Sequence, residues 1–311
     1  MATADVHRVG PAHPRRTGSP AVPAVLLLVL LLAGVVAPRP AVADADVAPV
    51  ESAPPGIAPA EIVPAVTAAY GDAGTLAVVV AHQEQRLTDV SIRAAEARSA
   101  RVLAHTAGNE LADRPFPTAS MVKLFLAEDL LHRARSGAIT LTPGDRAQLE
   151  VMIRSSDDPA ASDFWVRFDG ARMVRDVAAR YGLSATSPPA RWGQWGETMT
   201  TANDLAWFLV RLPVVAHPDD AALLQGWMRT ATPTAADGFD QQFGAFGTLP
   251  DAAVKQGWMC CLGGQRHLHS VGLVGERVVV LLSEVPSSVG WGGAKTALDA
   301  AAAAVPAPVP S

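Results

Sequence analysis

The segment TASMVKLF, residues 118 to 125, places a serine and a lysine three positions apart in an otherwise apolar stretch. On a helix, residues three apart share a face, so the Ser120 hydroxyl and the Lys123 amine would lie close together. A lysine withdrawn from water loses its proton more readily, and its neutral amine can accept the proton of a nearby serine hydroxyl. The chemistry open to this pair is nucleophilic attack by Ser120 with Lys123 as the base.

Lysine is rare in this chain, which makes its positions informative. Lys and Arg together number 25, but the sequence contains three lysines, Lys123, Lys255 and Lys295. Arginine stays protonated in proteins and cannot serve as a base, whereas lysine can. A position that keeps lysine is therefore a candidate for a titrating amine, although biased codon usage explains the same scatter equally well. Ser-x-x-Lys occurs once in the sequence and is a weak pattern by itself.

Two further segments carry groups that could join this pair. RSSDDPAASDFW, residues 154 to 165, places Ser156, Asp157 and Asp158 before a predicted helix. VKQGW, residues 254 to 258, places Lys255 on a predicted strand. A purely structural role is open for both, because Ser156 can cap the helix while the two aspartates favour its dipole, and Lys255 can be an exposed residue at a strand end.

The pattern of apolar residues predicts the elements that would position these groups. Strands are predicted over 75–83 and 101–110, helices through the middle of the chain from about residue 118, and three strands over 253–261, 267–275 and 277–285. Tight turns between the last three strands indicate an antiparallel meander. The predicted fold class is α/β of the α+β type, in which an antiparallel sheet is built from both chain ends, with flanking helices and an inserted helical lobe.

The N-terminal region has the order of a secretory signal peptide. Arginines at positions 8, 15 and 16 precede the apolar run 24–37, and small residues follow it at 41–43. We expect a signal peptide over 1–43 and a location that is secreted or extracytoplasmic, in the cell envelope. An uncleaved segment would instead anchor the chain in the membrane. A lipoprotein anchor is not expected, because no cysteine lies just after the apolar run to carry the lipid. We further predict a Pro/Ala-rich linker over 44–60, one hydrolase domain over 61–300 and a disordered tail over 301–311.

The composition of the chain restricts the kinds of molecule that it is expected to bind. A net charge of −5 and the lack of a basic patch interleaved with aromatic residues argue against nucleic-acid binding. We expect a monomer that acts on a small molecule or peptide and needs no cofactor.

The adjacent Cys260 and Cys261 could form a disulfide ring between neighbouring residues or remain thiols, and core packing is the expected role of at least one. His267 and His269 share a strand face, but no second ligand pair has matching spacing, so we predict no metal site.

Taken in order, these segments resemble the serine β-lactamase and penicillin-binding-protein superfamily, and most closely the class A β-lactamase-like secreted serine hydrolases. TASMVK is similar to the Ser-x-x-Lys element, SDDPAA to the Ser-Asp-Asn element and VKQGW to the Lys-Thr-Gly element. ETMTTANDLAWFL, residues 197 to 209, is similar to the Thr-Thr and helix-start region between the second and third elements. The likeness covers roughly residues 65 to 300.

This resemblance implies a role for each matching residue. Ser120 would be the nucleophile, and Lys123 its base or proton relay. Ser156 would pass a proton to the leaving nitrogen, and Lys255 would hold the hydroxyl network and attract a substrate carboxylate. The N–H groups of Ser120 and Trp258 would form the oxyanion hole, where one donor contributes about 3 kcal/mol of transition-state stabilisation.

The chain also departs from the family pattern within the predicted substrate-binding set, which comprises Asp158, Gln256, Gly257 and Trp258. Asp158 stands where the family usually has asparagine, and Gln256 replaces a hydroxyl residue, whereas Gly257 would let substrate lie close along the strand. The segment before Glu197 contains no convincing Glu-x-x-Leu-Asn element, which in the family supplies the carboxylate that activates water. Glu197 is the candidate for that role, but it lies close to the Thr-Thr element.

Three functional classes fit these observations. The first is a secreted acyl-serine hydrolase that acts on β-lactam-like compounds, peptidoglycan-derived peptides or esters, with slow deacylation. The second, which overlaps the first, is a D,D-peptidase. The third is a non-catalytic ligand- or peptidoglycan-binding module on a degenerate β-lactamase-like fold.

Overall fold

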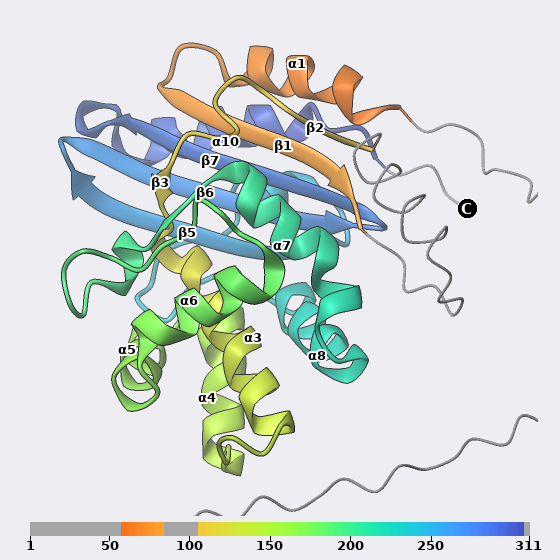
Figure 1. Ribbon diagram of the computed structural model, residues 1–311. Helices are drawn as coiled ribbons and strands as arrows, with labels where there is room; N and C mark the ends of the chain where they lie inside the picture. Colours follow the sequence, from red (N-terminus) through yellow and green to blue (C-terminus); the bar gives the residue numbers. More distant parts are fainter. Residues whose placement is uncertain (1–56, 84–104, 308–311) are drawn as a thin grey trace, which may run out of the picture. The chain divides into compact units, whose positions relative to one another are not determined.

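The computed structural model describes residues 57–83 and 105–307 (Figure 1). The chain divides into two units, 1–51 and 52–311, and all the described residues belong to the second. The predicted signal peptide and nearly all of the predicted linker lie outside the described residues. Within the described ranges, no helix combines the length and hydropathy that a membrane crossing requires.

A five-stranded antiparallel sheet forms the centre of this unit, in the order β2-β1-β7-β6-β5. Its strands are β1 (Thr75–His82), β2 (Thr106–Gly108), β5 (Ala253–Leu262), β6 (Gln265–Val274) and β7 (Arg277–Pro286). β1 pairs with β7 from Thr75–Glu284 to His82–Arg277, so the two ends of the chain share the sheet. β5 lies at one edge, and β6 follows it in a hairpin whose turn residues Gly263 and Gly264 both have positive φ.

Helices cover both faces of the sheet (Figure 1). One face carries α1 (Pro59–Tyr70) and α10 (Gly290–Ala303), whose apolar residues pack against β1 and β7 in one hydrophobic cluster. The other face packs against α7 (Ala202–Val215), which links the sheet to the helical lobe in a second cluster. Valine-rich β1 is buried from Leu76 to Ala81 because it is covered from both sides.

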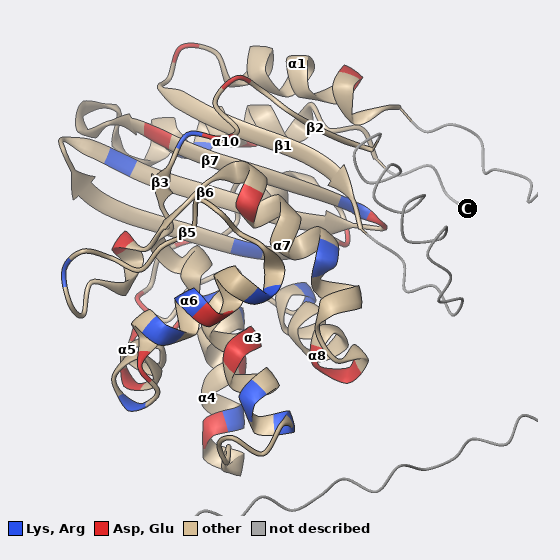
Figure 2. Ribbon diagram, in the orientation of Figure 1, with Lys and Arg blue, Asp and Glu red and all other residues tan. Residues whose placement is uncertain are grey.

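The helical lobe comes from the middle of the chain. It contains α3 (Val122–Arg135), α4 (Pro143–Arg154), α5 (Asp158–Arg167), α6 (Gly170–Tyr181) and α8 (Pro218–Arg229). The short elements are β3 (Phe116–Pro117), η1 (Ala119–Met121), η2 (Trp195–Glu197), β4 (Met199–Thr200), α9 (Ala245–Thr248) and η3 (Ser287–Val289). In Figure 2 positive and negative positions are intermixed over α3 to α6 and α8, so neither sign forms a continuous stretch in this view.

The sheet built from both chain ends, the final meander and the helical lobe confirm the predicted fold class. Two sequence predictions were wrong in detail. The expected disordered tail from 301 is instead helical at its start, because α10 continues to Ala303 and Val305 is buried. The prediction that at least one cysteine packs in the core was also wrong. Cys260 and Cys261 are both exposed, and a disulfide joins them at the end of β5.

Candidate active site

Ser120 lies in the single turn η1, at the start of the helix that continues as α3. The residue before it, Ala119, has φ of +45°, a conformation that is uncommon for a residue with a side chain. The segment is held from both sides. Thr118 N–H donates to Thr198 O at 2.7 Å, and a Cβ placed on Gly257 of β5 would lie 3.2 Å from the Ser120 nitrogen. A tightly enclosed serine that directly follows a strained residue is typical of a functional position.

Lys123 projects from the first turn of α3 and its side chain is fully buried. Its Nζ donates to the carbonyl of Ser156 at 2.6 Å and lies 3.2 Å from the Ser156 hydroxyl. Its third partner is Asp158 Oδ1, at 2.5 Å. The Ser120 hydroxyl forms no hydrogen bond with any residue of 57–83 or 105–307 in this arrangement, because Lys123 is directed to Ser156 and Asp158.

Ser156 is in the site rather than in the helix cap. Asp157 caps α5 by accepting from Ala160 N–H, which leaves the Ser156 side chain free of that task. Ser156 has φ of +55°, a second residue with a side chain in the left-handed region. Its hydroxyl lies 2.8 Å from Lys255 Nζ, which also donates to the Gln256 carbonyl at 2.8 Å. The Ser156 hydroxyl therefore lies between two lysine amines.

Burial controls the charge of these amines. Burial lowers the pKa of Lys123, and the Asp158 carboxylate opposes that shift. Burial also lowers the pKa of Lys255 to well below its ordinary value, and the charge of Lys123 lowers it further. The two amines share the Ser156 hydroxyl as a partner, so each disfavours the ammonium form of the other. Burial therefore favours the neutral amine at both positions.

An aromatic side chain covers the other side of Lys123. The ring of Trp195, in η2, has its centroid 4.9 Å from Lys123 Nζ, and its indole N–H donates to Ser162 of α5 at 3.2 Å. A Cβ on the next residue, Gly196, would lie 3.7 Å from Ala119 Cα. The turn η2 thus packs over both η1 and α5, and it shields the lysine from water.

Comparison with known proteins gives relatives in mycobacteria. No protein-family model matches the sequence. Proteins of Mycobacterium tuberculosis and Mycobacterium bovis named "Putative lipoprotein LppW" are 41% identical over 181 residues, which is 54% of this chain and 55% of theirs. The chain therefore spans about half the length of the curated relatives it matches.

Solved structures match over a larger share of the chain. A β-lactamase from Desulfarculus baarsii has a TM-score of 0.57 at 16% identity and covers 80% of this chain and 97% of its own. The class A β-lactamase from Mycobacterium abscessus has a TM-score of 0.55 at 18% identity, covering 79% and 96%. The chain has the class A β-lactamase fold. This confirms the fold that the three short segments implied.

Within this β-lactamase fold, the structure brings together Ser120, Lys123, Ser156 and Lys255, the four residues named from the sequence as catalytic candidates. Asp158 also joins them, but it faces Lys123 and contributes a carboxylate where an amide donor would have been expected.

The other predicted substrate-binding residues lie on β5 and differ in direction. Side chains alternate across a strand, so Lys255 and Gly257 face η1 while Gln256 and Trp258 face the opposite side. Gln256 Nε2 donates to the carbonyls of Gln241 and Phe243, and its side chain is buried there. The structure therefore does not bring the Gln256 side chain to Ser120.

Trp258 forms part of an aromatic group beside the strand. Its ring stacks on Phe239 at a centroid distance of 4.6 Å, and its indole N–H donates to Asp237 at 3.1 Å. The side chain is thus occupied on the face away from Ser120, and what Trp258 can contribute to the site is its backbone.

Glu197 is placed in η2 but is held by another group. Arg191 binds its carboxylate through both Nε, at 3.0 Å, and Nη2. Within the part of the chain that the structure describes, Glu197 forms no hydrogen bond or ion pair with Ser120 or Lys123. The group that lies against Lys123 from η2 is Trp195.

Two residues of the site were missed from the sequence. Trp195 was not singled out because a tryptophan in a Gly-rich segment gives no signal of a lysine contact. His269 was considered only as a metal ligand, yet its Nε2 lies 2.8 Å from the Pro117 carbonyl and its Nδ1 accepts from Ser283 N–H at 3.2 Å. Because Nδ1 accepts, Nε2 carries the proton, and His269 fixes the segment that leads into Ser120.

Proposed function

We propose that this chain is an extracytoplasmic serine hydrolase that forms an acyl-enzyme at Ser120 and deacylates slowly. The observation that carries the proposal is the position of the Ser156 hydroxyl, which lies 2.8 Å from Lys255 Nζ and 3.2 Å from Nζ of Lys123, a residue one helical turn beyond Ser120. Such a chain of hydroxyl and amine groups can carry a proton away from a nucleophile and deliver it to a leaving group.

In the proposed acylation, neutral Lys123 takes the Ser120 hydroxyl proton as Oγ attacks the substrate carbonyl carbon. The tetrahedral intermediate then collapses and the bond to the leaving nitrogen or oxygen breaks. That atom receives the Ser156 hydroxyl proton, and Ser156 is reprotonated from the lysine ammonium. The products are the Ser120 ester and a neutral leaving group, so the proton count balances.

The oxyanion that develops in this step requires oriented N–H donors. We assign the backbone N–H groups of Ser120 and Trp258 to this role. Supporting the assignment, the backbone around Gly257 lies against the backbone of residues 118–120, within contact distance of an added Cβ. Donors fixed in this way stabilise the transition state without reorganising.

Slow deacylation follows from the partners of the nearby carboxylates. Among the described residues, Glu197 is bound by Arg191 and Asp158 by Lys123, so neither is free to activate a water molecule. The remaining side of Lys123 is covered by Trp195. Acylation is therefore expected to outpace hydrolysis of the ester.

The proposed substrate class is supported by the fold, whereas the proposed location is supported by the sequence and its relatives. The β-lactamase fold favours β-lactam-like or peptidoglycan-derived amides, and esters are also compatible with this site. The predicted signal peptide and the mycobacterial relatives named as lipoproteins both support a place in the cell envelope.

The test is intact-protein mass spectrometry of the protein mixed with a penicillin and, separately, with a p-nitrophenyl ester, sampled over time. A persistent adduct that is lost in Ser120→Ala is the expected result. Rapid loss of the adduct would show efficient deacylation and contradict the slow step. No adduct from either compound would contradict the hydrolase.

One observation favours a second candidate, a ligand- or peptidoglycan-binding module. The Lys123–Asp158 ion pair occupies the amine that would be the base. A binding module would retain peptidoglycan fragments equally well in Ser120→Ala, whereas the hydrolase would lose its covalent adduct. The same variant therefore distinguishes the two.

A further inference from the structure

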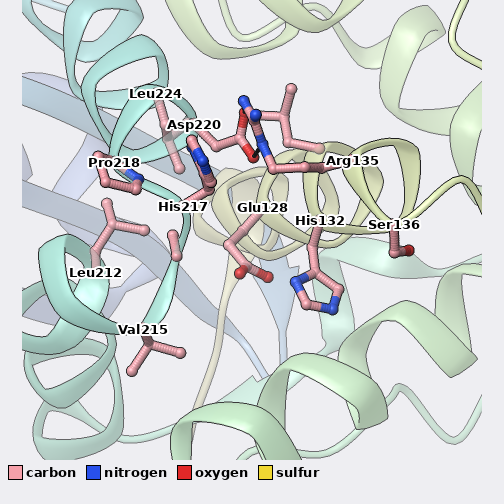
Figure 3. Close-up of a pocket in the computed structure, with 12 residues that line it drawn as sticks. Glu128, His132, Arg135, Ser136, Leu212, Val215, His217, Pro218, Asp220 and Leu224 are labelled. Carbon is pink, nitrogen blue, oxygen red and sulfur yellow. Dashed lines mark hydrogen bonds and ion pairs between the residues drawn. The ribbon is translucent and has the colours of Figure 1, made fainter.

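A cavity of about 350 Å³ lies between α3, α7 and α8 (Figure 3), and its lining includes none of the candidate active-site residues. Its apolar walls come from all three helices and include Leu131, Leu212, Val215 and Leu224. Glu128 and His132, one turn apart on α3, supply polar groups (Figure 3). This volume is within the range of small-molecule sites.

The most buried ionisable group that lines this cavity is the side chain of Glu128, which is only 3% exposed. Its Oε1 accepts from the Tyr181 hydroxyl at 3.0 Å. Its Oε2 makes no hydrogen bond, although Arg180 Nη2 lies 3.2 Å away. Burial raises the pKa of Glu128 to about 7, with Arg180 opposing the shift. A buried acceptor without a donor is costly, and a ligand N–H could supply one.

The charges around the cavity favour a cation. Two carboxylates line the cavity, those of Glu128 and Asp220, together with one guanidinium group, that of Arg135, and two imidazoles, those of His132 and His217. With both imidazoles neutral, this lining carries one uncompensated negative charge when both carboxylates are ionised, which a bound cation would neutralise. An anion would instead add to the repulsion.

We propose that this cavity binds a small organic amine, whose ammonium group donates to Glu128 Oε2 and whose apolar body packs against Leu131, Leu212, Val215 and Leu224. The walls exclude water from the apolar part, and the Glu128 carboxylate fixes the orientation of the ammonium group. The site is separate from the hydrolase chemistry, since Glu128 follows Ser120 by about two helical turns along α3.

The proposal can be tested by methyl NMR of the whole protein with three probes of one shape: benzylamine, benzyl alcohol and benzoate. Benzylamine at millimolar concentration is expected to shift the methyl signals of Leu131, Val215 and Leu224. Benzyl alcohol should bind at least about tenfold more weakly, because it lacks the charge-assisted hydrogen bond, and benzoate should not bind.

Glu128→Gln is the matched variant, because it keeps the shape of the side chain and removes its charge. It should weaken benzylamine binding about tenfold or more and leave benzyl alcohol unchanged. Leu224→Phe fills the cavity and leaves Glu128 in place, so it should abolish binding of benzylamine and of benzyl alcohol. This second variant keeps the proposal testable if Glu128→Gln fails to fold. Equal benzylamine affinity in wild type and Glu128→Gln, undiminished binding in Leu224→Phe, or shifts scattered away from this cavity would overturn the proposal. None of these outcomes depends on acylation of Ser120.

Discussion

The Asp158 carboxylate forms an ion pair with the buried ammonium group of Lys123, with Oδ1 and Nζ 2.5 Å apart. Asp158 is half exposed, whereas Lys123 has no exposed side-chain surface. The carboxylate therefore holds a proton on an amine whose burial alone would favour the neutral form. Asp158 competes with Ser120 for Lys123, and this competition sets how readily the site can start its reaction.

Asp158→Asn should speed acylation. Without the carboxylate, burial lowers the pKa of Lys123 further, and the neutral fraction near pH 7 rises about tenfold for each unit that the pKa falls. The pH profile of the acylation rate should move to lower pH, as measured by single-turnover mass spectrometry from pH 5 to pH 9. Asp163→Asn is the control, because Asp163 lies on the same helix and pairs with Arg167. A profile that is unchanged in Asp158→Asn would contradict this account of the pair.

Lys123→Arg should abolish acylation while the protein stays folded. Arginine keeps the positive charge beside Asp158 but cannot take a proton from Ser120. Loss of a general base lowers the rate by about 10² to 10⁴. Thermal unfolding and adduct formation with a penicillin would be measured together. Normal acylation by Lys123→Arg would exclude Lys123 as the base.

Gly257→Ala should reduce acylation without unfolding the sheet. An added Cβ would lie 3.2 Å from the Ser120 nitrogen and 3.3 Å from the Thr118 carbonyl oxygen, so these backbone atoms must move by a few tenths of an ångström. A displaced N–H in the oxyanion hole costs about 3 kcal/mol of transition-state stabilisation, or about a hundredfold in rate. The rate constant of adduct formation is the measurement. Gly226→Ala is a matched control, since no atom lies within 4 Å of its added Cβ. A Gly257→Ala rate equal to that of Gly226→Ala would contradict the close approach.

Much of the fold could be predicted from local patterns. The valine-rich segments that became β1 and β7 are apolar along their whole length because helices cover both faces of the sheet. The helices α1 and α10 were not anticipated as the cover of one face. Their Ala-rich sequences carry a weak apolar pattern, and their packing depends on strands far away in the chain.

The catalytic candidates could be predicted because each belongs to a short motif with fixed spacing. The directions of the side chains within these motifs could not be predicted. Gln256 and Asp158 lie where the motifs place them, yet Gln256 turns to the Gln241 and Phe243 carbonyls and Asp158 turns to Lys123. These directions are decided by partners that are distant in the sequence. The contact between Trp195 and Lys123 could not be predicted either, because the two residues are 72 positions apart in the sequence.

His269 should make the protein sensitive to acid. Burial lowers the pKa of His269 to about 3, whereas an unfolded histidine has a pKa near 6.5. Between these values the unfolded state binds the proton and the folded state does not, so this contribution to stability is full above pH 6.5 and is lost as the pH falls toward 3. At pH 4 the loss amounts to about 3 kcal/mol, from 1.36 kcal/mol per pH unit.

Glu128 titrates in the opposite direction, because its raised pKa of about 7 favours the folded state at low pH. The test therefore compares variants rather than pH values alone. Urea unfolding of wild type and His269→Gln at pH 7 and pH 4 should show that the variant loses about 3 kcal/mol less than wild type on acidification. Glutamine has an amide N–H that can reach the Pro117 carbonyl but does not titrate, so the difference isolates the charge. An equal loss of stability in the two proteins would mean that His269 is protonated in the folded state, and the hydrogen bond that Nδ1 accepts from Ser283 N–H would then be ruled out.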